Sequence, residues 1–280
     1  LISIASAFFG IEINTQSYTG LLIFSALIGS VGSFISLMIS KWSAKRSMGV
    51  QIIDPQRATG EQRQLIDAVH RFARAAQLPA MPEVGIYHSP EVNAFATGPS
   101  KSNSLVAVST GLLSSMSWDE VEGVLGHEVA HIANGDMVAL TLIQGVVNTF
   151  VIFFTRVLAS IIASSGSSEN RRSSGGMEIL LYYVFQIAFG LLGSIVVAYF
   201  SRRREFRADK GSAQFAGKGK MISALQALQH NVNRVMPAQE NEQFASFKIS
   251  GGKMAGFKAL FSTHPPLEAR IAALQNNPSF

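Results

Sequence analysis

The chain has 280 residues, of which 48% are hydrophobic and 15% are charged, and its formal net charge is +5. This share of charged residues is low for a water-soluble protein, so membrane-spanning segments are expected. The absence of cysteine excludes a disulfide framework and any thiolate metal site, so a metal ion here would be held by nitrogen and oxygen ligands.

Three stretches are long enough and free enough of charge to cross a membrane as helices. Residues 20–40, 137–155 and 179–200 contain no Asp, Glu, Lys or Arg, and ~20 residues of helix match a hydrocarbon core of ~30 Å. Helices buried in a large soluble core are the alternative, but such helices seldom stay uncharged for this length. The apolar residues 1–10 are too few to span a bilayer. We interpret them as the end of a further spanning helix, with a processed signal peptide as the weaker option.

Basic residues beside these stretches predict the topology. By the positive-inside rule, the clusters place residues 41–136 and 201–280 on the cytoplasmic side, where they can form one domain. The clusters consist of Lys41, Lys45 and Arg46, and of Arg202, Arg203, Arg204 and Arg207. Membrane orientation and anionic lipid account for these charges, so the lipid bilayer is an expected partner and nucleic acid is not.

The resulting organisation alternates membrane and cytoplasmic parts. A serine- and glycine-rich stretch at 164–178 is typical of a flexible linker and is expected as an external loop. The expected parts are 1–40 with spanning segments, the first incomplete and the second at about 20–40; 41–136 as the first cytoplasmic part; 137–200 with two spanning helices at about 137–160 and 179–200; and 201–280 as the second cytoplasmic part.

The first cytoplasmic part is expected to combine helices with a small antiparallel sheet. Apolar residues at helical spacing predict an amphipathic helix over 61–76. Short β-type segments, separated by Ser-Pro and Gly-Pro breaks, predict strands at 83–87, 92–97 and 104–109. Ser117 and Glu120 then form a capping-box pattern, which predicts a helix from near Trp118 through His131.

This capped helix carries the strongest chemical signal, the sequence His127-Glu128-Val-Ala-His131. Residues four apart share a helical face, so both imidazoles can bind one cation, while Glu128 is rotated by about 100° and can reach a water on the metal. Zinc suits such ligands, and Glu128 would take the proton from a zinc-bound water as it attacks a peptide carbonyl. The alternative is two surface or core histidines without a metal.

A catalytic zinc site needs a third protein ligand. The histidine found six residues further on in metzincins is missing here, so a cytoplasmic acidic residue or histidine is required. Glu205 is the strongest candidate, and Asp209 follows four residues later on the same helical face, where it could orient a ligand histidine. The same residues could equally form a solvated helix with ion pairs between neighbouring turns. Further helices are expected at 202–216, 220–232 and 266–275.

Four motifs together resemble the HtpX-type bacterial membrane zinc peptidases, which are related to the CAAX prenyl endopeptidases. The motifs are HEVAHIANGD at 127–136, NAFATG at 93–98, SRRREFRAD at 201–209 and STHPPLEARI at 262–271. The resemblance covers nearly the whole chain. It implies a mainly α membrane protein in which a gluzincin-like cytoplasmic domain, with the small antiparallel sheet, is carried on a transmembrane helix bundle. It also implies that Glu205 is the third zinc ligand.

The resemblance further implies that the strand with Asn93, Ala94 and Phe95 lines the cleft and pairs with the substrate backbone. An edge strand offers free N–H and C=O groups to an extended peptide. The alternative is a strand that only packs Phe95 in the core. His264 precedes two prolines, and it could donate to the oxyanion of the reaction or hold the C-terminal helix against the domain.

The expected function is a zinc endopeptidase, with one Zn²⁺ per chain, that acts on polypeptides. The resemblance implies a multi-pass protein of the bacterial inner membrane with a cytoplasmic active site, which degrades misfolded or damaged membrane proteins under stress. The alternative is a non-enzymatic membrane transporter or scaffold with a structural zinc. Against transport, the three clear spans carry no ionisable residue. Prenyl-protein processing is disfavoured because it would need a larger helical chamber.

Overall fold

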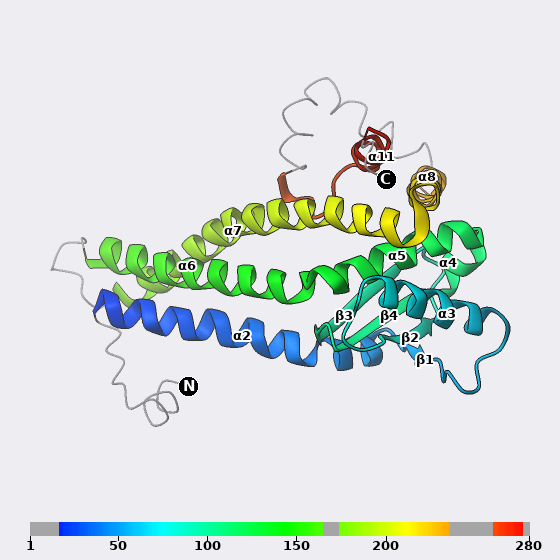
Figure 1. Cartoon of the computed structure of the whole chain (residues 1–280). Helices are drawn as coiled ribbons and strands as arrows, with labels where there is room; N and C mark the ends of the chain where they lie inside the picture. The colour runs from blue at the N-terminus through cyan, green and yellow to red at the C-terminus, as the bar shows by residue number, and fades with distance from the viewer. Residues whose placement is uncertain (1–16, 165–173, 236–259, 277–280) are drawn as a thin grey trace, which may run out of the picture. The chain divides into compact units, whose positions relative to one another are not determined.

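The computed structural model describes residues 17–164, 174–235 and 260–276 (Figure 1). The chain divides into two compact units. Unit 1 comprises Leu1–Ser36 and Leu140–Ala198, and unit 2 comprises Leu37–Ala139 and Tyr199–Phe280. The prediction for residues 1–10 lies outside the described part of the chain.

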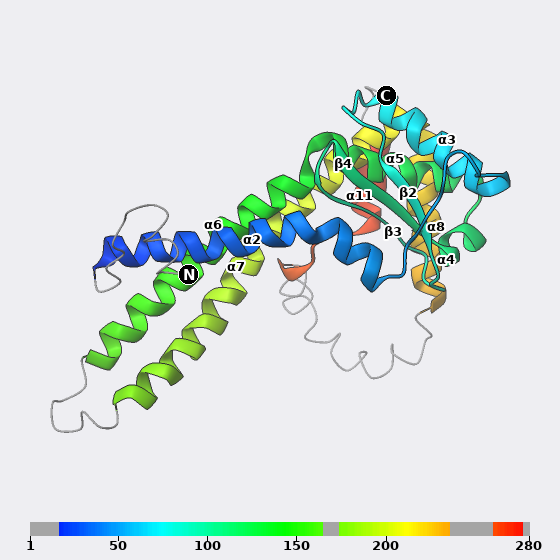
Figure 2. The same cartoon turned by 90° about the horizontal axis from the view of Figure 1, so that it is seen from below.

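Unit 1 is built from parts of three long helices, α2 (Tyr18–Ser47), α6 (Asp136–Ser164) and α7 (Ser174–Ser212). All three are long and apolar enough to cross a membrane. Helices α6 and α7 lie side by side (Figures 1 and 2), and the rings of Phe154 and Phe189 meet between them at 6.0 Å. Many large apolar side chains on these helices are exposed, as expected for surfaces that face lipid.

The loop prediction for 164–178 differs from the structure at its end. Residues 174–178 already form the first turns of α7, and the helix then continues without a break to Ser212. We expected a separate helix over 202–216. Because no glycine or proline interrupts the basic stretch 202–209, the spanning segment and the acidic pair share one helix.

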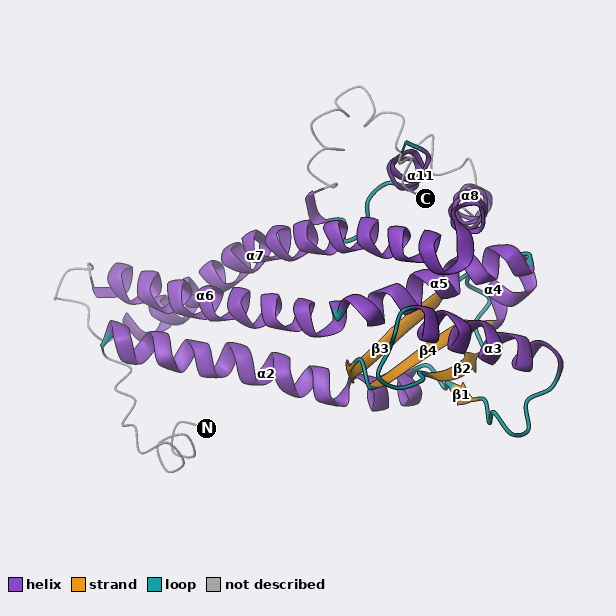
Figure 3. Ribbon diagram, viewed as in Figure 1, coloured by secondary structure: helices purple, strands orange, loops and turns teal. Residues whose placement is uncertain are grey.

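Unit 2 contains a four-stranded sheet (Figure 3), and its pairing corrects one prediction. The strands are β1 (Gln51–Ile52), β2 (Glu83–Tyr87), β3 (Ala94–Ser100) and β4 (Asn103–Ser109), in the order β1-β2-β4-β3. The sheet is mixed, because β2 and β4 run parallel while the other pairs are antiparallel. Strands β3 and β4 form an antiparallel hairpin, and β4 is the strand of this hairpin that pairs with β2. Strand β4 runs opposite to the edge strand β3 and in the same direction as β2.

The helices of unit 2 pack against the sheet or against one another. They are α3 (Gly60–Ala75), α4 (Thr110–Ser115), α5 (Trp118–Asn134), the π-helix η2 (Ala213–Gly217), α8 (Lys218–Val235) and α11 (Leu267–Gln275). The main core joins Leu65 and Phe72 of α3, Val106 of β4, and Leu125 and Val129 of α5. Helix α5 lies between the sheet and α8 (Figure 1), so it is covered on two sides.

Two helix predictions near the centre of unit 2 are confirmed. Helix α3 matches the amphipathic pattern at 61–76. Helix α5 begins at Trp118, where the backbone N–H of Ser117 donates to Glu120 Oε2 at 2.7 Å. This contact satisfies one backbone group at the start of α5 and holds the first turn of the helix in place.

Close backbone contacts bring α5 against the helices that follow α6. A Cβ atom at Gly123 would lie 2.5 Å from the backbone oxygen of Lys220, and one at Gly211 would lie 2.5 Å from Ala130 Cβ. Ser212 Oγ adds a hydrogen bond of 2.7 Å to the Gly123 oxygen. Helix α5 can therefore approach the end of α7 closely, which places residues 205 and 209 within reach of its side chains.

Gly123→Ala should destabilise the protein, because the added methyl group has no room beside the backbone of Lys220. Overpacking of this kind costs about 1–3 kcal/mol. Gly219 of α8 has open space around its Cβ position, so Gly219→Ala should gain about 0.5–1 kcal/mol from helix propensity. Thermal unfolding of the two variants in detergent measures both effects. A Gly123→Ala variant as stable as Gly219→Ala would contradict the close packing of α5.

Candidate metal centre

Three side chains from α5 and α7 converge on one point. His127 and His131 lie one turn apart on α5, and their Nε2 atoms are 3.0 Å apart. Glu205 of α7 places Oε2 3.6 Å from His127 Nε2 and Oε1 3.4 Å from His131 Nε2. Ligand atoms bound tetrahedrally at ~2.0–2.1 Å from a metal lie ~3.3 Å from one another. The spacing of these three donors therefore fits a four-coordinate metal ion with one position left for water or substrate.

The outer nitrogen of each histidine meets a buried carboxylate. His127 Nδ1 lies 2.9 Å from Asp209 Oδ1, and His131 Nδ1 lies 2.7 Å from Asp136 Oδ2. With Nδ1 protonated and donating to these oxygens, both Nε2 lone pairs point to the common centre. The structure places Asp209 where the sequence led us to expect an orienting carboxylate.

The matching position of Asp136 was not predicted from the sequence, where Asp136 stands only as the last residue of the HEVAHIANGD motif. Asp136 is the first residue of α6 and is buried, and its side chain turns back toward His131. Arg204 Nη1 donates to the backbone oxygen of Asp136 at 3.0 Å, and Arg207 Nη2 lies 3.4 Å from its Oδ1. Two arginines of α7 therefore contact Asp136 and help to fix the carboxylate that binds His131.

Arg270 of α11 was also missed, although it lies within the STHPPLEARI motif. It is buried, with 6% of its surface exposed. Its Nε donates to Asp209 Oδ2 at 2.8 Å, its Nη2 donates to Asp209 Oδ1, and its Nη1 lies 3.2 Å from Glu205 Oε2. One guanidinium thus binds both Glu205 and Asp209. Spacing alone could not reveal this contact, because 61 residues separate Arg270 from Asp209.

Burial and charge set the protonation of these groups. Burial opposes ionisation of Glu205, but the neighbouring imidazoles of His127, His131 and His264 outweigh it and hold the pKa of Glu205 far below its usual range. Burial lowers the pKa of His131, whereas its contacts with Asp136 and Glu205 raise that pKa to about 9. Metal binding requires neutral imidazoles, so it would displace protons from these histidines.

Glu128 faces the sheet beside this cluster. Its side chain is half-buried, and burial raises the pKa of its carboxyl group. The backbone of Ala96 in β3 lies close enough to this carboxylate to oppose that rise in pKa. Glu128 therefore lies between the metal ligands and the edge of the sheet.

Strand β3 forms that edge, and the residues at its start differ in whether their backbone groups and side chains face β4, the core or solvent. The Asn93 oxygen accepts from the Ser109 N–H at 2.9 Å, and Phe95 is opposite Ala107 of β4. Backbone groups alternate along an antiparallel pair, so those of Ala94 and Ala96 face away from β4. Phe95 packs its ring 5.6 Å from that of Tyr87, which agrees with the packing alternative for this side chain. Asn93 has an exposed side chain.

His264 lies at the entrance of the cluster. Its Nδ1 is 3.0 Å from Glu205 Oε2, while 66% of its side chain is exposed. It precedes α11, the helix that carries Arg270. The imidazole is therefore near the metal ligands and open to an incoming molecule.

Comparisons with known proteins agree with this geometry. The model of peptidase family M48 matches residues 59–277. A protein named Protease HtpX from Shewanella oneidensis is 56% identical over 268 residues, covering 94% of this chain and 91% of the relative. Protease HtpX from Shewanella baltica is 54% identical over 267 residues, covering 94% and 90%.

A solved structure, the crystal structure of S. mikatae Ste24p, shares the fold with a TM-score of 0.59 at 17% identity. The match covers 98% of this chain and 60% of that longer chain. Together with the apolar helices, the relatives identify a multi-pass membrane protein. Metalloprotease activity is supported over the transporter or scaffold alternative. The chain belongs to peptidase family M48, among the HtpX proteases.

Proposed function

We propose that the chain is a zinc-dependent endopeptidase that cleaves misfolded or damaged membrane proteins at the cytoplasmic face of the bacterial inner membrane. The observation that carries this proposal is the convergence of His127, His131 and Glu205, whose ligand atoms lie within 4.8 Å of one another. Two nitrogens and one oxygen in tetrahedral spacing are the donor set that zinc takes in hydrolytic enzymes.

Glu128 is the proposed general base. When bound, zinc would lower the pKa of a water toward ~7 and polarise the peptide carbonyl. Glu128 accepts the proton of the attacking water and returns it to the leaving amine. Burial raises its pKa, which suits a group that must both accept and release a proton.

The remaining side chains position the reaction. Asp209 and Asp136 hold the two imidazoles, and Arg270 fixes Asp209 and Glu205. The exposed imidazole of His264 would donate to the oxyanion that forms on the substrate carbonyl. Each of these side chains contacts one of the proposed metal ligands, and these contacts support the proposed roles.

Strand β3 is the proposed substrate-binding edge. An extended peptide added to this edge would pair with the outward backbone groups of Ala94 and Ala96, and Asn93 could add its side-chain amide. The backbone of Ala96 lies beside Glu128, so a peptide paired with β3 would lie next to the general base. Recognition through the backbone makes the protease tolerant of substrate sequence, as the removal of damaged proteins requires.

The charge distribution supports the cytoplasmic orientation. Lys45 and Arg46 lie in the last turn of α2, and four arginines follow the apolar part of α7. These ends of the spanning helices therefore face the cytoplasm by the positive-inside rule. The metal ligands on α5 and α7 belong to the same unit as both clusters.

Glu128→Gln should keep the metal but abolish proteolysis, because the amide has nearly the same shape and cannot accept a proton. General-base catalysis contributes about 10²–10⁴-fold, so kcat should fall by at least about 100-fold. Metal analysis and casein cleavage by the detergent-solubilised protein measure the two properties. Glu61→Gln, at an exposed position of α3, controls for the loss of a carboxylate. Wild-type cleavage by purified Glu128→Gln protein would remove this mechanism.

Two variants should lower the affinity for zinc by different amounts. Glu205→Ala removes a ligand and should lose zinc almost completely. Arg270→Gln leaves all ligands but frees Asp209 and Glu205 to move, and loss of such support typically costs about 10–100-fold in affinity. Arg270→Lys should not restore binding, because an ammonium cannot make the bidentate contact.

Competition with a zinc chelator measures these affinities. Arg57→Gln is the matched control, since 90% of its side chain is exposed and it pairs with Asp54 in a surface contact. Wild-type affinity in Glu205→Ala would contradict the three-ligand site. An Arg270→Gln affinity equal to that of Arg57→Gln would limit Arg270 to a role outside the metal centre.

Strand addition can be tested on the substrate. If a cleavable peptide is N-methylated at one backbone amide at a time, KM should rise only at alternate positions, because successive N–H groups of a strand point in opposite directions. Each lost hydrogen bond should raise KM by about 2–10-fold. Circular dichroism is not needed as a control, since the enzyme is unchanged. A uniform increase along the peptide would argue against pairing with β3.

A further inference from the structure

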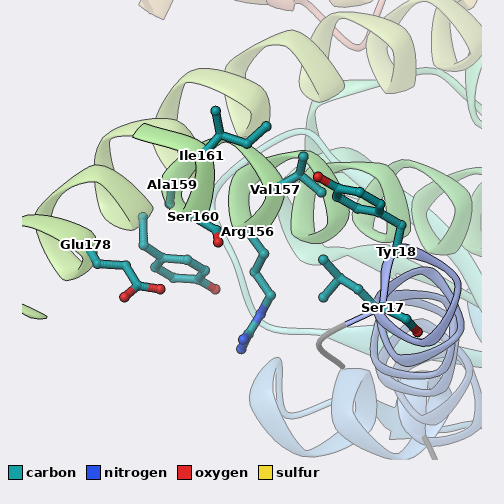
Figure 4. Close-up of a pocket in the computed structure, with 10 residues that line it drawn as sticks. Ser17, Tyr18, Arg156, Val157, Ala159, Ser160, Ile161 and Glu178 are labelled. Carbon is teal, nitrogen blue, oxygen red and sulfur yellow. The ribbon is translucent and has the colours of Figure 1, made fainter. Parts of the chain in front are cut away.

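A polar cavity in unit 1 lies where the charge-free parts of three helices end. The cavity has a volume of about 370 Å³, which is within the range of ~300–1,000 Å³ for small-molecule sites. Figure 4 shows Arg156 of α6, Glu178 of α7, and Ser17 and Tyr18 at the start of α2 around it. Ser160 and Tyr182 also line it.

The position of Arg156 along α6 gives the depth of this cavity. Arg156 is the only charged residue of α6 after Asp136, and it comes twenty residues later. Twenty residues of helix span ~30 Å, the thickness of a hydrocarbon core. Tyr18 and Tyr182 fit the aromatic belt at this level. The cavity therefore lies at the depth of lipid headgroups.

Arg156 is held by aromatic rings and has no acidic partner. Its guanidinium carbon lies 5.3 Å from the centre of the Phe24 ring and 5.8 Å from that of Tyr182. Among the residues that the structure describes, it makes neither a hydrogen bond nor an ion pair. Rings that contact the face of a guanidinium leave its N–H donors free in the plane, where they match two oxygens of a phosphate.

Glu178 brings the opposite charge to the same cavity. Over the described part of the chain, it makes no ion pair with Arg156 or with another side chain. A purely anionic headgroup would satisfy Arg156 but would leave Glu178 beside a second negative charge. A headgroup with both a phosphate and a primary ammonium satisfies both side chains at once.

We propose that this cavity binds the headgroup of a zwitterionic phospholipid of the phosphatidylethanolamine type, with the phosphate on Arg156 and the ammonium on Glu178. Ser160 and Tyr182 supply further hydroxyl donors for the phosphate oxygens. The proposal concerns unit 1 alone and does not depend on the proteolytic function proposed above.

Lipid binding to the full-length, delipidated chain in detergent tests the proposal. Native mass spectrometry with dioleoyl phosphatidylethanolamine should give an affinity at least about tenfold higher than with the corresponding phosphatidylglycerol, the difference expected for one charge-assisted hydrogen bond. Inorganic phosphate with free ethanolamine should not raise the unfolding temperature, whereas the phospholipid should. Equal affinity for the two lipids, or equal stabilisation by free phosphate, would overturn the proposal.

Two variants assign the contacts. Arg156→Gln should weaken phosphatidylethanolamine binding by about tenfold, and Glu178→Gln should remove the preference over phosphatidylglycerol. Arg203→Gln is the matched control, because Arg203 also lies over a tyrosine, at 5.7 Å from the Tyr199 ring, beyond the other end of the charge-free part of α7. It should bind like the wild type. An equal loss in Arg156→Gln and Arg203→Gln would show nonspecific attraction to interfacial arginines. If Arg156→Gln does not fold, retained lipid preference in Glu178→Gln still refutes the site.

Discussion

The burial of the Glu205 carboxylate between two imidazoles is the constraint on which the rest of unit 2 depends. A buried charge is costly unless other groups pair with it. Glu205 is 2% exposed and meets His127, His131, His264 and Arg270. These partners come from α5, α11 and the segment before α11. The two chain segments that form unit 2 must therefore pack together for this carboxylate to be satisfied.

The same principle explains why the outer residues of the cluster are charged. Asp209 and Asp136 are buried to the same degree as Glu205, and each meets both a histidine and an arginine. These contacts link the charged groups to one another, so removing one member leaves another charge without its partner. The geometry of the two imidazoles is thus held by contacts from α6, which follows α5 directly, and from α7 and α11, which are remote from α5 in sequence.

The sheet and the membrane helices serve this centre in different ways. Strand β3 is paired with β4 along one edge and stands at the end of the strand order in the described part of the chain, and the backbone of its Ala96 lies beside Glu128. Helix α7 carries the apolar segment and Glu205 without a break. The lipid-exposed surface of unit 1 has its own polar cavity, so the helices combine anchoring with a chemically distinct site at headgroup depth.

Local patterns in the sequence determined the spanning stretches, the amphipathic helix α3, the capped start of α5 and the shared face of His127 and His131. Helical periodicity and capping act over a few residues, so sequence alone can reveal them. Glu205 and Asp209 could be proposed as a pair, but their spacing equally fitted a solvated helix. Only the tertiary structure decided that they meet the histidines, that Asp136 and Arg270 complete the cluster, and that β4 lies parallel to β2. Asp136 lies only five residues after His131, but its side chain turns back only because of how α6 follows α5. The other features join residues far apart in the chain, and their pairing depends on how helices and strands pack, which no local pattern records.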